Sequence, residues 1–311
     1  MRVISQRRFG GPEVLEVMEA ARPVPGAGEV LVRVHAAGVN PADRLARCGE
    51  APVFGDPPFT LGLDVSGVVA ETGADVTLYR PGDEVFAMVP GGGYAEYVTV
   101  RADALAPKPA SVDHVHAAAA PRACLTAWQA LVGLGRVGPG HRVLIHAAAG
   151  GVGHIAVQLA KVQGAYVIAT ARTELHGFLR DLGVDEPLDH TRTDFALTVR
   201  HVDIALDLVG GDYGPRSLAT LRPGGLLVPA VLTGLGVTPE EAAARAARLR
   251  PVVVRPSGTT LGKAAALMAA GRLRPHVSAV LPLEEAGKAH EIAAAGPTQG
   301  RIVLTVQPVW T

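Results

Sequence analysis

Two patterns of hydrophobic and polar positions divide the chain. Up to about residue 110, short valine-rich runs such as EVLVRVHAAGV, DVSGVVAETG and YAEYVTV alternate with turns that contain proline and glycine. Short apolar runs between such turns are typical of antiparallel strands. The first part of the chain therefore predicts an all-β unit, a barrel or a sandwich.

A different pattern begins near residue 120, where apolar strands alternate with helical stretches. The predicted strands read RVLIH, AYVIAT, VDIALDLV, GGLLVPAV and PVVV, and helices are expected near 152–163, 174–182, 213–221 and 239–248. This alternation predicts an α/β fold with a doubly wound parallel sheet. After about residue 260, a helix, a strand, a second helix and a last strand follow.

The first strand of this second part runs directly into a glycine-rich turn and a helix, in residues 142–161. Gly150 lets the backbone approach a pyrophosphate, Gly153 lets the helix pack close to the strand, and the helix N-terminus offers N–H groups to the negative charge. Ala148 replaces the first glycine of the usual G-x-G-x-x-G. A tight turn without a ligand is the alternative, but the next strand, 165–170, favours a dinucleotide site.

The end of that next strand distinguishes the two nicotinamide dinucleotides. NAD sites place an acid there to accept the ribose 2′-hydroxyl, whereas NADP sites place a cation. Here the position holds Arg172, and His176 and Arg180 follow within two turns. A guanidinium suits a phosphate, although a solvated arginine at a helix start is the alternative. The pattern favours NADPH over NADH.

Composition narrows the class of protein. The 311 residues suffice for two domains, and 48% hydrophobic with 19% charged residues provide a large core. Lys plus Arg and Asp plus Glu are 29 each, so the zero net charge does not favour a nucleic acid or an anionic membrane as partner. No apolar run approaches the roughly 20 residues of a membrane span, and the N-terminus has no signal region. We expect a cytoplasmic protein.

Segments spread over almost the whole chain carry a family likeness. They are AAGVNPAD (36–43), LGLDVSGVVAETGADVT (61–77), RPGDEVFAM (80–88), GGYAEYV (92–98), LTAWQAL (125–131), HAAAGGVGHIAVQLAK (146–161), LPLEEAGKAHE (281–291) and GRIVL (300–304). The chain resembles the medium-chain dehydrogenase/reductase superfamily, specifically its zinc-independent quinone oxidoreductase and enoyl reductase branch. The resemblance implies a GroES-like β-rich substrate domain, residues 1–120 and 260–311, and a Rossmann domain, residues 121–259. It also implies an active-site cleft between them, and a homodimer.

The same resemblance tests for zinc. Zinc-dependent relatives have a cysteine in the first of these segments, a histidine-glutamate pair in the second and a cysteine shortly before LTAW. This chain has Asn40, Leu63-Asp64 and Arg122 at those positions, and the four-cysteine structural zinc loop is missing. Cys124 lies two residues away from the last position, and one thiolate cannot build a tetrahedral site. We predict no metal.

Without a Lewis acid, hydride transfer requires an acceptor that is already electrophilic, such as a quinone or an α,β-unsaturated carbonyl. Hydrogen-bond donors must then stabilise the oxyanion. The resemblance places Asn40 beside nicotinamide and substrate, which makes it the first candidate donor; capping the helix that follows is the alternative. Asp43 and Asp64 lie in segments that form the implied cleft, but a first-turn acid and a structural acceptor are alternatives for them.

The resemblance also implies contacts to NADPH. The backbone of Ala149, Gly150, Gly151, Val152 and Gly153 is expected to cradle the pyrophosphate. Thr126 is expected near the nicotinamide ribose or the phosphates, with an ordinary helix threonine as the alternative. Leu208, Val209 and Ala230, at strand ends, are expected to border adenosine and nicotinamide. Lysine and tyrosine are common in relatives where His176 and the segment DHTRTDF stand here, so 2′-phosphate recognition leans on Arg172.

The sequence predicts an NADPH-dependent quinone or enone reductase. One alternative is an enoyl reductase dedicated to a biosynthetic enone, acyl or polyketide-like. Another is a non-catalytic relative that binds NADPH.

Overall fold

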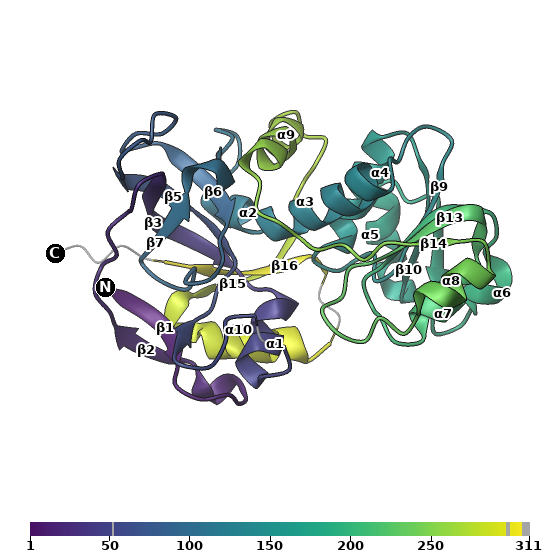
Figure 1. Ribbon diagram of the computed structural model, residues 1–311, viewed down its shortest axis with the longest axis horizontal. Helices are drawn as coiled ribbons and strands as arrows, with labels where there is room; N and C mark the ends of the chain where they lie inside the picture. Colours follow the sequence, from purple (N-terminus) through teal and green to yellow (C-terminus); the bar gives the residue numbers. More distant parts are fainter. Residues whose placement is uncertain (52, 297–298, 307–311) are drawn as a thin grey trace. The chain divides into compact units, whose positions relative to one another are not determined.

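The computed structural model describes residues 1–51, 53–296 and 299–306, and it divides into two compact units (Figure 1). One comprises Met1–Arg122 and Pro256–Thr311, and the other Ala123–Arg255. We call them the split unit and the central unit. The domain limits expected from the sequence, 120/121 and 259/260, lie two and four residues from these limits.

A mixed sheet forms the centre of the split unit. Its strands follow the order β15-β16-β3-β5-β6-β8, with β7 also paired to β3, and all pairs are antiparallel except β15 with β16. The strands are β3 (Glu29–Gly38), β5 (Asp64–Thr72), β6 (Glu84–Met88), β7 (Tyr97–Arg101), β8 (Leu105–Pro107), β15 (Val277–Pro282) and β16 (Arg301–Thr305). Because β16 pairs with β3, the end of the chain completes the sheet that the beginning starts.

A second, smaller sheet and several helices complete the described part of the split unit. The sheet has the order β2-β1-β4, with β1 (Arg2–Gln6), β2 (Glu16–Glu19) and β4 (Phe59–Thr60). The helices are α1 (Pro41–Cys48), α2 (His114–Ala118), α9 (Gly258–Ala269) and α10 (Ala286–Ala294). Valines 30, 32 and 34 of β3 are buried in the core, together with Ile302 and Leu304 of β16. The β-rich unit predicted from the valine-rich runs is confirmed.

The central unit contains a six-stranded, fully parallel sheet in the order β11-β10-β9-β12-β13-β14. Its strands are β9 (Arg142–Ile145), β10 (Tyr166–Ala171), β11 (Glu186–Asp189), β12 (Val202–Asp207), β13 (Leu221–Pro229) and β14 (Arg248–Leu249). The strand order reverses direction between β9 and β12, and such a switch point is where ligands bind in open α/β sheets. The predicted doubly wound sheet is confirmed.

The helices of the central unit include one within each of the four predicted ranges, shorter than predicted by two to four residues. They are α3 (Pro121–Ala127), which starts in the split unit, α4 (Gly153–Val162), α5 (His176–Asp181), α6 (Phe195–Thr198), α7 (Tyr213–Leu218) and α8 (Pro239–Ala244). The last strand differs: it covers Arg248–Leu249 rather than PVVV, and the expected 239–248 helix ends earlier. Pro251 has no N–H to donate to a strand ladder, so the regular strand stops before it.

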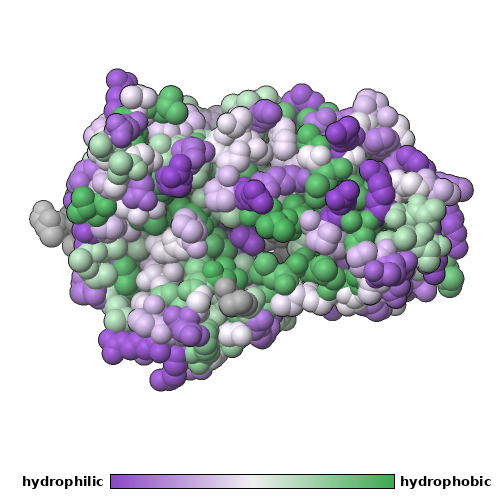
Figure 2. Space-filling model, viewed as in Figure 1, coloured by the Kyte–Doolittle hydropathy of each residue, from purple (hydrophilic) through white to green (hydrophobic). Residues whose placement is uncertain are grey.

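On the face drawn in Figure 2, hydrophobic residues lie among hydrophilic ones. Within the described residues no helix combines the length and apolar character that crossing a membrane requires.

Candidate active site

The turn between β3 and α1 brings several distant segments together. A side chain at Gly38 would place its Cβ 2.6 Å from the Ala118 carbonyl oxygen and 3.1 Å from Arg301 Nη2. Only glycine therefore lets the end of β3 approach these groups. Asn40 follows in extended conformation (φ −121°, ψ 151°) at the N-cap of α1, and Pro41 occupies the first helical turn.

Asn40 is 2% exposed, and its side chain has one defined orientation. Nδ2 donates to the Gly38 carbonyl oxygen (3.3 Å) and to Asp64 Oδ2 (3.2 Å). Because both neighbours are acceptors, the amide nitrogen must face them. Oδ1 has no hydrogen-bond partner among the described residues. Asn40 therefore presents a hydrogen-bond acceptor, whereas the sequence analysis expected a donor.

Asp43 ties this turn to the segment before β5. The carboxylate of Asp43 accepts from the Asn40 N–H (2.9 Å) and from the Gly62 N–H (3.0 Å). The Tyr94 hydroxyl donates to it over 3.4 Å. Burial raises the pKa of Asp43 to about 6, and the two amide donors oppose this rise. Asp43 is 0% exposed, so its contacts are structural ones within the split unit.

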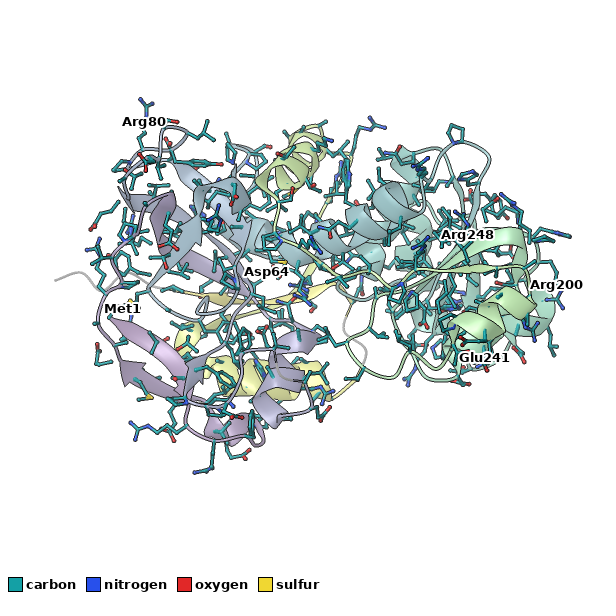
Figure 3. All side chains as sticks on the ribbon, viewed as in Figure 1. Met1, Asp64, Arg80, Arg200, Glu241 and Arg248 are labelled. Carbon is teal, nitrogen blue, oxygen red and sulfur yellow. The ribbon has the colours of Figure 1, made fainter. Side chains whose placement is uncertain are left out.

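Asp64, at the start of β5, is equally buried, and it lies in the interior of the split unit while Arg80 projects outward (Figure 3). Oδ1 accepts from the Arg122 N–H (2.7 Å), and Oδ2 accepts from Arg301 Nη2 as well as from Asn40. Burial raises the pKa of the Asp64 carboxyl, and the Arg301 guanidinium counteracts the rise. Asp64 is thus the structural acceptor that the sequence analysis kept as an alternative.

These contacts decide whether zinc fits. The positions that correspond to zinc ligands are Asn40, the pair Leu63-Asp64 and Arg122; the Asn40 side chain and the Arg122 backbone N–H both donate to Asp64. Both Asp64 oxygens already accept hydrogen bonds, however, and a guanidinium carries positive charge and cannot ligate a cation. Among the described residues no group of three or more His, Cys, Asp and Glu side chains could hold a metal ion. The residues present do not fit zinc.

In the central unit the turn after β9 leaves backbone donors open. Its left-handed residue is Ala147 (φ 48°), so Ala148 needs no special backbone angle. The N–H groups of Ala149, Gly151, Val152 and Gly153 make no hydrogen bond to any described residue. A Cβ at Gly153 would lie 2.4 Å from the Ala147 carbonyl oxygen and 2.6 Å from Ala148 Cα. The close packing expected of Gly153 is present, and the turn offers unpaired donors to an anion.

The segment after β10 carries the expected cation. Arg172 is exposed, and its side chain forms no ion pair or hydrogen bond with a described residue. His176 lies four residues further, at the start of α5, with Nε2 3.3 Å from the Ala171 carbonyl oxygen. Arg180 is exposed on the same helix. Arg172 is therefore available to a ligand at the carboxyl edge of the sheet.

The sequence analysis missed a second cation at this edge. Asp189 ends β11 beside Ala171 of β10, and it accepts from the N–H and hydroxyl groups of both Thr173 and Thr191. These hydrogen bonds hold the pKa of Asp189 below its usual range. Arg192 pairs with Asp189 (3.8 Å) and follows β11 as Arg172 follows β10. Its strand was not predicted because EPLD contains one large apolar residue.

Asp207 at the end of β12 was also missed. It is 0% exposed; Oδ1 accepts from the Val209 and Gly210 N–H groups (2.9 Å each), and Oδ2 has no partner among the described residues. Burial raises the pKa of Asp207. The sequence feature that could have identified Asp207 is an acidic residue at the end of an apolar strand.

Three of the remaining predicted contacts, Leu208, Val209 and Ala230, lie just after the ends of the neighbouring strands β12 and β13. Leu208 and Val209 follow Asp207, and the Ala230 N–H donates to the Asp207 carbonyl oxygen (2.8 Å), so these residues share the edge formed by β12 and β13. Val209 is 46% exposed. Thr126 is buried in α3.

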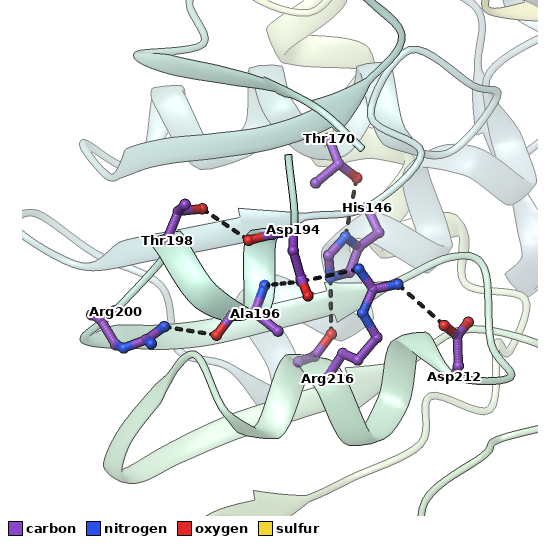
Figure 4. A network of polar contacts seen from close by, with 9 residues as sticks. His146, Thr170, Asp194, Ala196, Thr198, Arg200, Asp212 and Arg216 are labelled. Atoms are coloured by element: carbon purple, nitrogen blue, oxygen red, sulfur yellow. Dashed lines mark hydrogen bonds and ion pairs between the residues drawn. The ribbon is translucent and has the colours of Figure 1, made fainter. Parts of the chain in front are cut away.

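A buried histidine supports the glycine-rich turn. His146, between β9 and Ala147, has Nδ1 3.0 Å from Thr170 Oγ1 (Figure 4). Its Nε2 lies 2.9 Å from Ser217 Oγ. Its ring packs against those of Phe195 and Tyr213, at 4.5 and 4.9 Å between centroids. Burial, and secondarily Arg216, lowers the pKa of His146 to about 3. The neutral ring joins β9, β10 and α7 just before the turn.

Family models match two parts of the chain. Residues 26–110 match the alcohol dehydrogenase GroES-like domain, and residues 182–304 match a family described as zinc-binding dehydrogenase. Among curated relatives, a quinone oxidoreductase from Sus scrofa is 33% identical, over 98% of this chain and 97% of its own length.

Solved structures agree. Quinone oxidoreductase from Coxiella burnetii is 36% identical with a TM-score of 0.94, covering 99% of both chains. The Escherichia coli quinone oxidoreductase complexed with NADPH has a TM-score of 0.90 at 28% identity, covering 98% of this chain and 100% of that one. The CurK enoyl reductase also has a TM-score of 0.90, at 29% identity over 98% and 99% of the two chains.

Both units thus have counterparts along the full length of these proteins. The chain is an oxidoreductase of the medium-chain dehydrogenase/reductase family and belongs to its quinone oxidoreductase and enoyl reductase branch.

Proposed function

We propose that the protein is an NADPH-dependent reductase that transfers hydride to quinones or other α,β-unsaturated carbonyls without zinc. The observation that carries this proposal is the turn Ala149–Gly153, whose unpaired N–H groups stand at the switch point of a parallel sheet that also presents Arg172. The quinone oxidoreductase of similar fold was solved in complex with NADPH.

The residues of the central unit fit NADPH. Backbone donors from Ala149 to Gly153 would hold the pyrophosphate, and Arg172 would hold the 2′-phosphate, joined by His176 and Arg192. The apolar and small residues Leu208, Val209 and Ala230 would border the nicotinamide half, and Thr126 a ribose or phosphate. When bound, NADPH supplies the hydride.

In the split unit, Asn40 is the residue that we propose to face the ligand. Its Oδ1 would accept a hydrogen bond from an amide or hydroxyl group, since both Nδ2 hydrogens are already used. We assign Asp43 and Asp64 the task of holding Asn40, not of contacting substrate. Because Asp43 and Asp64 are fully buried, we propose that the proton comes from solvent.

The residues that follow β12 and β13 form an apolar surface, which favours an uncharged hydride acceptor. Val209 and Leu232 are 46% and 49% exposed, and the loop 230–238 contains no charged residue. Gly211 donates to the Gly234 carbonyl oxygen (2.7 Å), so the two loops pack backbone to backbone. Free quinones and enones suit this apolar surface better than acyl groups on an anionic carrier. The dedicated enoyl reductase remains the second candidate because the CurK enoyl reductase has the same fold.

We further propose a homodimer. The edge strand β14 has two residues, and the backbone beyond it continues along β13 through Val252, whose N–H donates to the Pro229 carbonyl oxygen (2.9 Å). Such an edge can pair with a second copy across a two-fold axis. Light scattering after gel filtration tests this; a monomer at micromolar concentration would contradict it.

The function is tested by titrating NADPH and NADH into the wild type and into Arg172→Asp. Oxidation of NADPH by 9,10-phenanthrenequinone and by a simple enone follows. A charge reversal beside the 2′-phosphate should weaken NADPH binding at least about tenfold, since a charge-assisted hydrogen bond contributes roughly 1.5–3 kcal/mol. NADH binding should change little.

The matched control is Arg245→Asp, an exposed arginine of the same unit that follows α8 and precedes β14, the strand at the other end of the strand order from β11. It should leave both affinities unchanged. Equal affinity of the wild type for the two nucleotides would refute the role of Arg172. NADPH binding without turnover of either acceptor would point to a dedicated biosynthetic enone or to a non-catalytic protein.

A further inference from the structure

A chain of buried polar side chains connects α10 to the Asn40 turn, and the reaction proposed above does not use it. Tyr94 is fully buried, with its hydroxyl 3.4 Å from Asp43 Oδ2 and 3.3 Å from His290 Nε2. His290 lies on α10, 1% exposed, with Nδ1 3.1 Å from Arg47 Nη1. The tyrosine and histidine rings meet edge to face, 6.0 Å between centroids.

The direction of every hydrogen bond in this chain follows from Arg47. A guanidinium only donates, so His290 Nδ1 must accept and Nε2 must carry the proton. Nε2–H then donates to the Tyr94 oxygen, and the Tyr94 hydroxyl donates to Asp43. Burial lowers the pKa of His290 to about 3, with Arg47 acting in the same direction, and raises the pKa of Tyr94 well above its usual value. Neither group changes charge near neutral pH.

Arg47 itself is held in place. It is 3% exposed, and its Nε donates to the Gly10 carbonyl oxygen (3.2 Å) and Nη2 to Cys48 Sγ (3.4 Å). The chain from Arg47 to Asp43 is therefore anchored at one end by backbone and ends at the carboxylate that accepts from the Asn40 N–H.

We propose that Tyr94 and His290 are positioning residues of the reaction, which hold the Asp43 carboxylate in the orientation that presents Asn40 to the ligand. The inference rests on the role proposed for Asn40. Removing the Tyr94 hydroxyl takes a hydrogen-bond donor away from ionised Asp43. The pKa of Asp43 is then set by its burial, by the Gly62 and Asn40 amides, and by the charges of Asp64 and Arg122. The proton affinity of Asp43 must then rise.

The test is the pH profile of kcat/KM, from initial rates with 9,10-phenanthrenequinone between about pH 5.5 and 9. In the wild type the acid limb should have its midpoint near 6, the pKa of Asp43. In Tyr94→Phe that midpoint should rise by about one unit, which lowers the rate about threefold near pH 6.5 and restores it near pH 9. Recovery at high pH is not expected of a variant that is merely less stable.

Tyr79→Phe is the matched control. The Tyr79 hydroxyl is partly buried in the split unit and donates to the Leu105 carbonyl oxygen (2.8 Å), but it makes no hydrogen bond to Asp43, Tyr94, His290 or Arg47. This variant should keep the wild-type midpoint. An unchanged midpoint in Tyr94→Phe would overturn the inference while leaving the proposed function intact, because the wild type would still turn over quinone.

Asp43→Asn gives an independent result if Tyr94→Phe does not fold. The amide cannot ionise, so the acid limb should vanish and kcat/KM should stay at the low-pH level of the wild type. An acid limb with the wild-type midpoint in Asp43→Asn would overturn the inference. No turnover by the wild type itself would instead refute the proposed function.

Discussion

The two units differ in whether the polar groups of their candidate sites already have hydrogen-bond partners. In the split unit, Asp43 and Asp64 are fully buried and every oxygen of both carboxylates accepts a hydrogen bond. In the central unit, the turn Ala149–Gly153 keeps unpaired N–H groups, and Arg172 is exposed. The difference predicts that mutations of the buried carboxylates and their partners act mainly on stability, whereas mutations of the open turn act on the binding that we propose for it.

The largest effect should follow from breaking the frame at Arg301. Arg301→Leu leaves the Asp64 carboxylate buried without its guanidinium, which costs about 3–5 kcal/mol of unfolding free energy. Urea denaturation measures the loss. Arg101→Leu is the comparison, because the Arg101–Asp103 pair is exposed to solvent and should contribute little to stability. Equal losses in the two variants would contradict the description of Asp64 as a structural centre.

Low pH should destabilise the central unit at His146, which directly precedes the glycine-rich turn. The pKa of His146 in the folded protein is about 3, below the ordinary value, so the unfolded chain binds a proton first as the pH falls. The stability that the neutral ring provides is fully present above pH 6.5. As the pH falls from 6.5 towards the folded-state pKa, this stability is lost, by at most about 1.4 kcal/mol per pH unit. The urea concentration at the unfolding midpoint should decrease as the pH is lowered from 6.5 to 4, and this decrease should be smaller in His146→Asn.

His201→Asn provides the control for that measurement. His201 is exposed and has a left-handed backbone (φ 59°), which asparagine tolerates well. Its pH slope should equal that of the wild type. A wild-type slope in His146→Asn would mean that His146 does not titrate between the folded and unfolded states.

A smaller effect should come from filling the space at Gly153. Gly153→Ala places a methyl group against the Ala147 and Ala148 backbone, which costs about 1–3 kcal/mol and distorts the N–H groups that we propose to bind pyrophosphate. Gly177→Ala in α5 has no neighbour within 4 Å of the new Cβ and should be neutral or stabilising. Calorimetry with NADPH should show weaker binding only in Gly153→Ala; unchanged binding there would contradict the proposed use of the turn.

The prediction from sequence succeeded where neighbours along the chain decide the structure. Gly153 and its close approach to Ala148 belong to a single strand-turn-helix, and Arg172 directly follows an apolar strand, so both could be located from local pattern. The β11 strand and Arg192 were missed because their sequence, EPLD followed by HTR, lacks the apolar run that marks a strand. Pairing with β10 forms that strand, and a single-sequence pattern does not contain it.

The sequence by itself determined the alternation of elements, the family likeness and the type of each candidate residue. Only the tertiary structure decided what those residues do. Asn40, Asp64, Arg122 and Arg301 come from four separated segments, and their contacts orient the Asn40 amide and satisfy both oxygens of the buried Asp64 carboxylate. The physical reason is that the role of a polar side chain depends on its burial and on which partners use its lone pairs and protons. Folding supplies both.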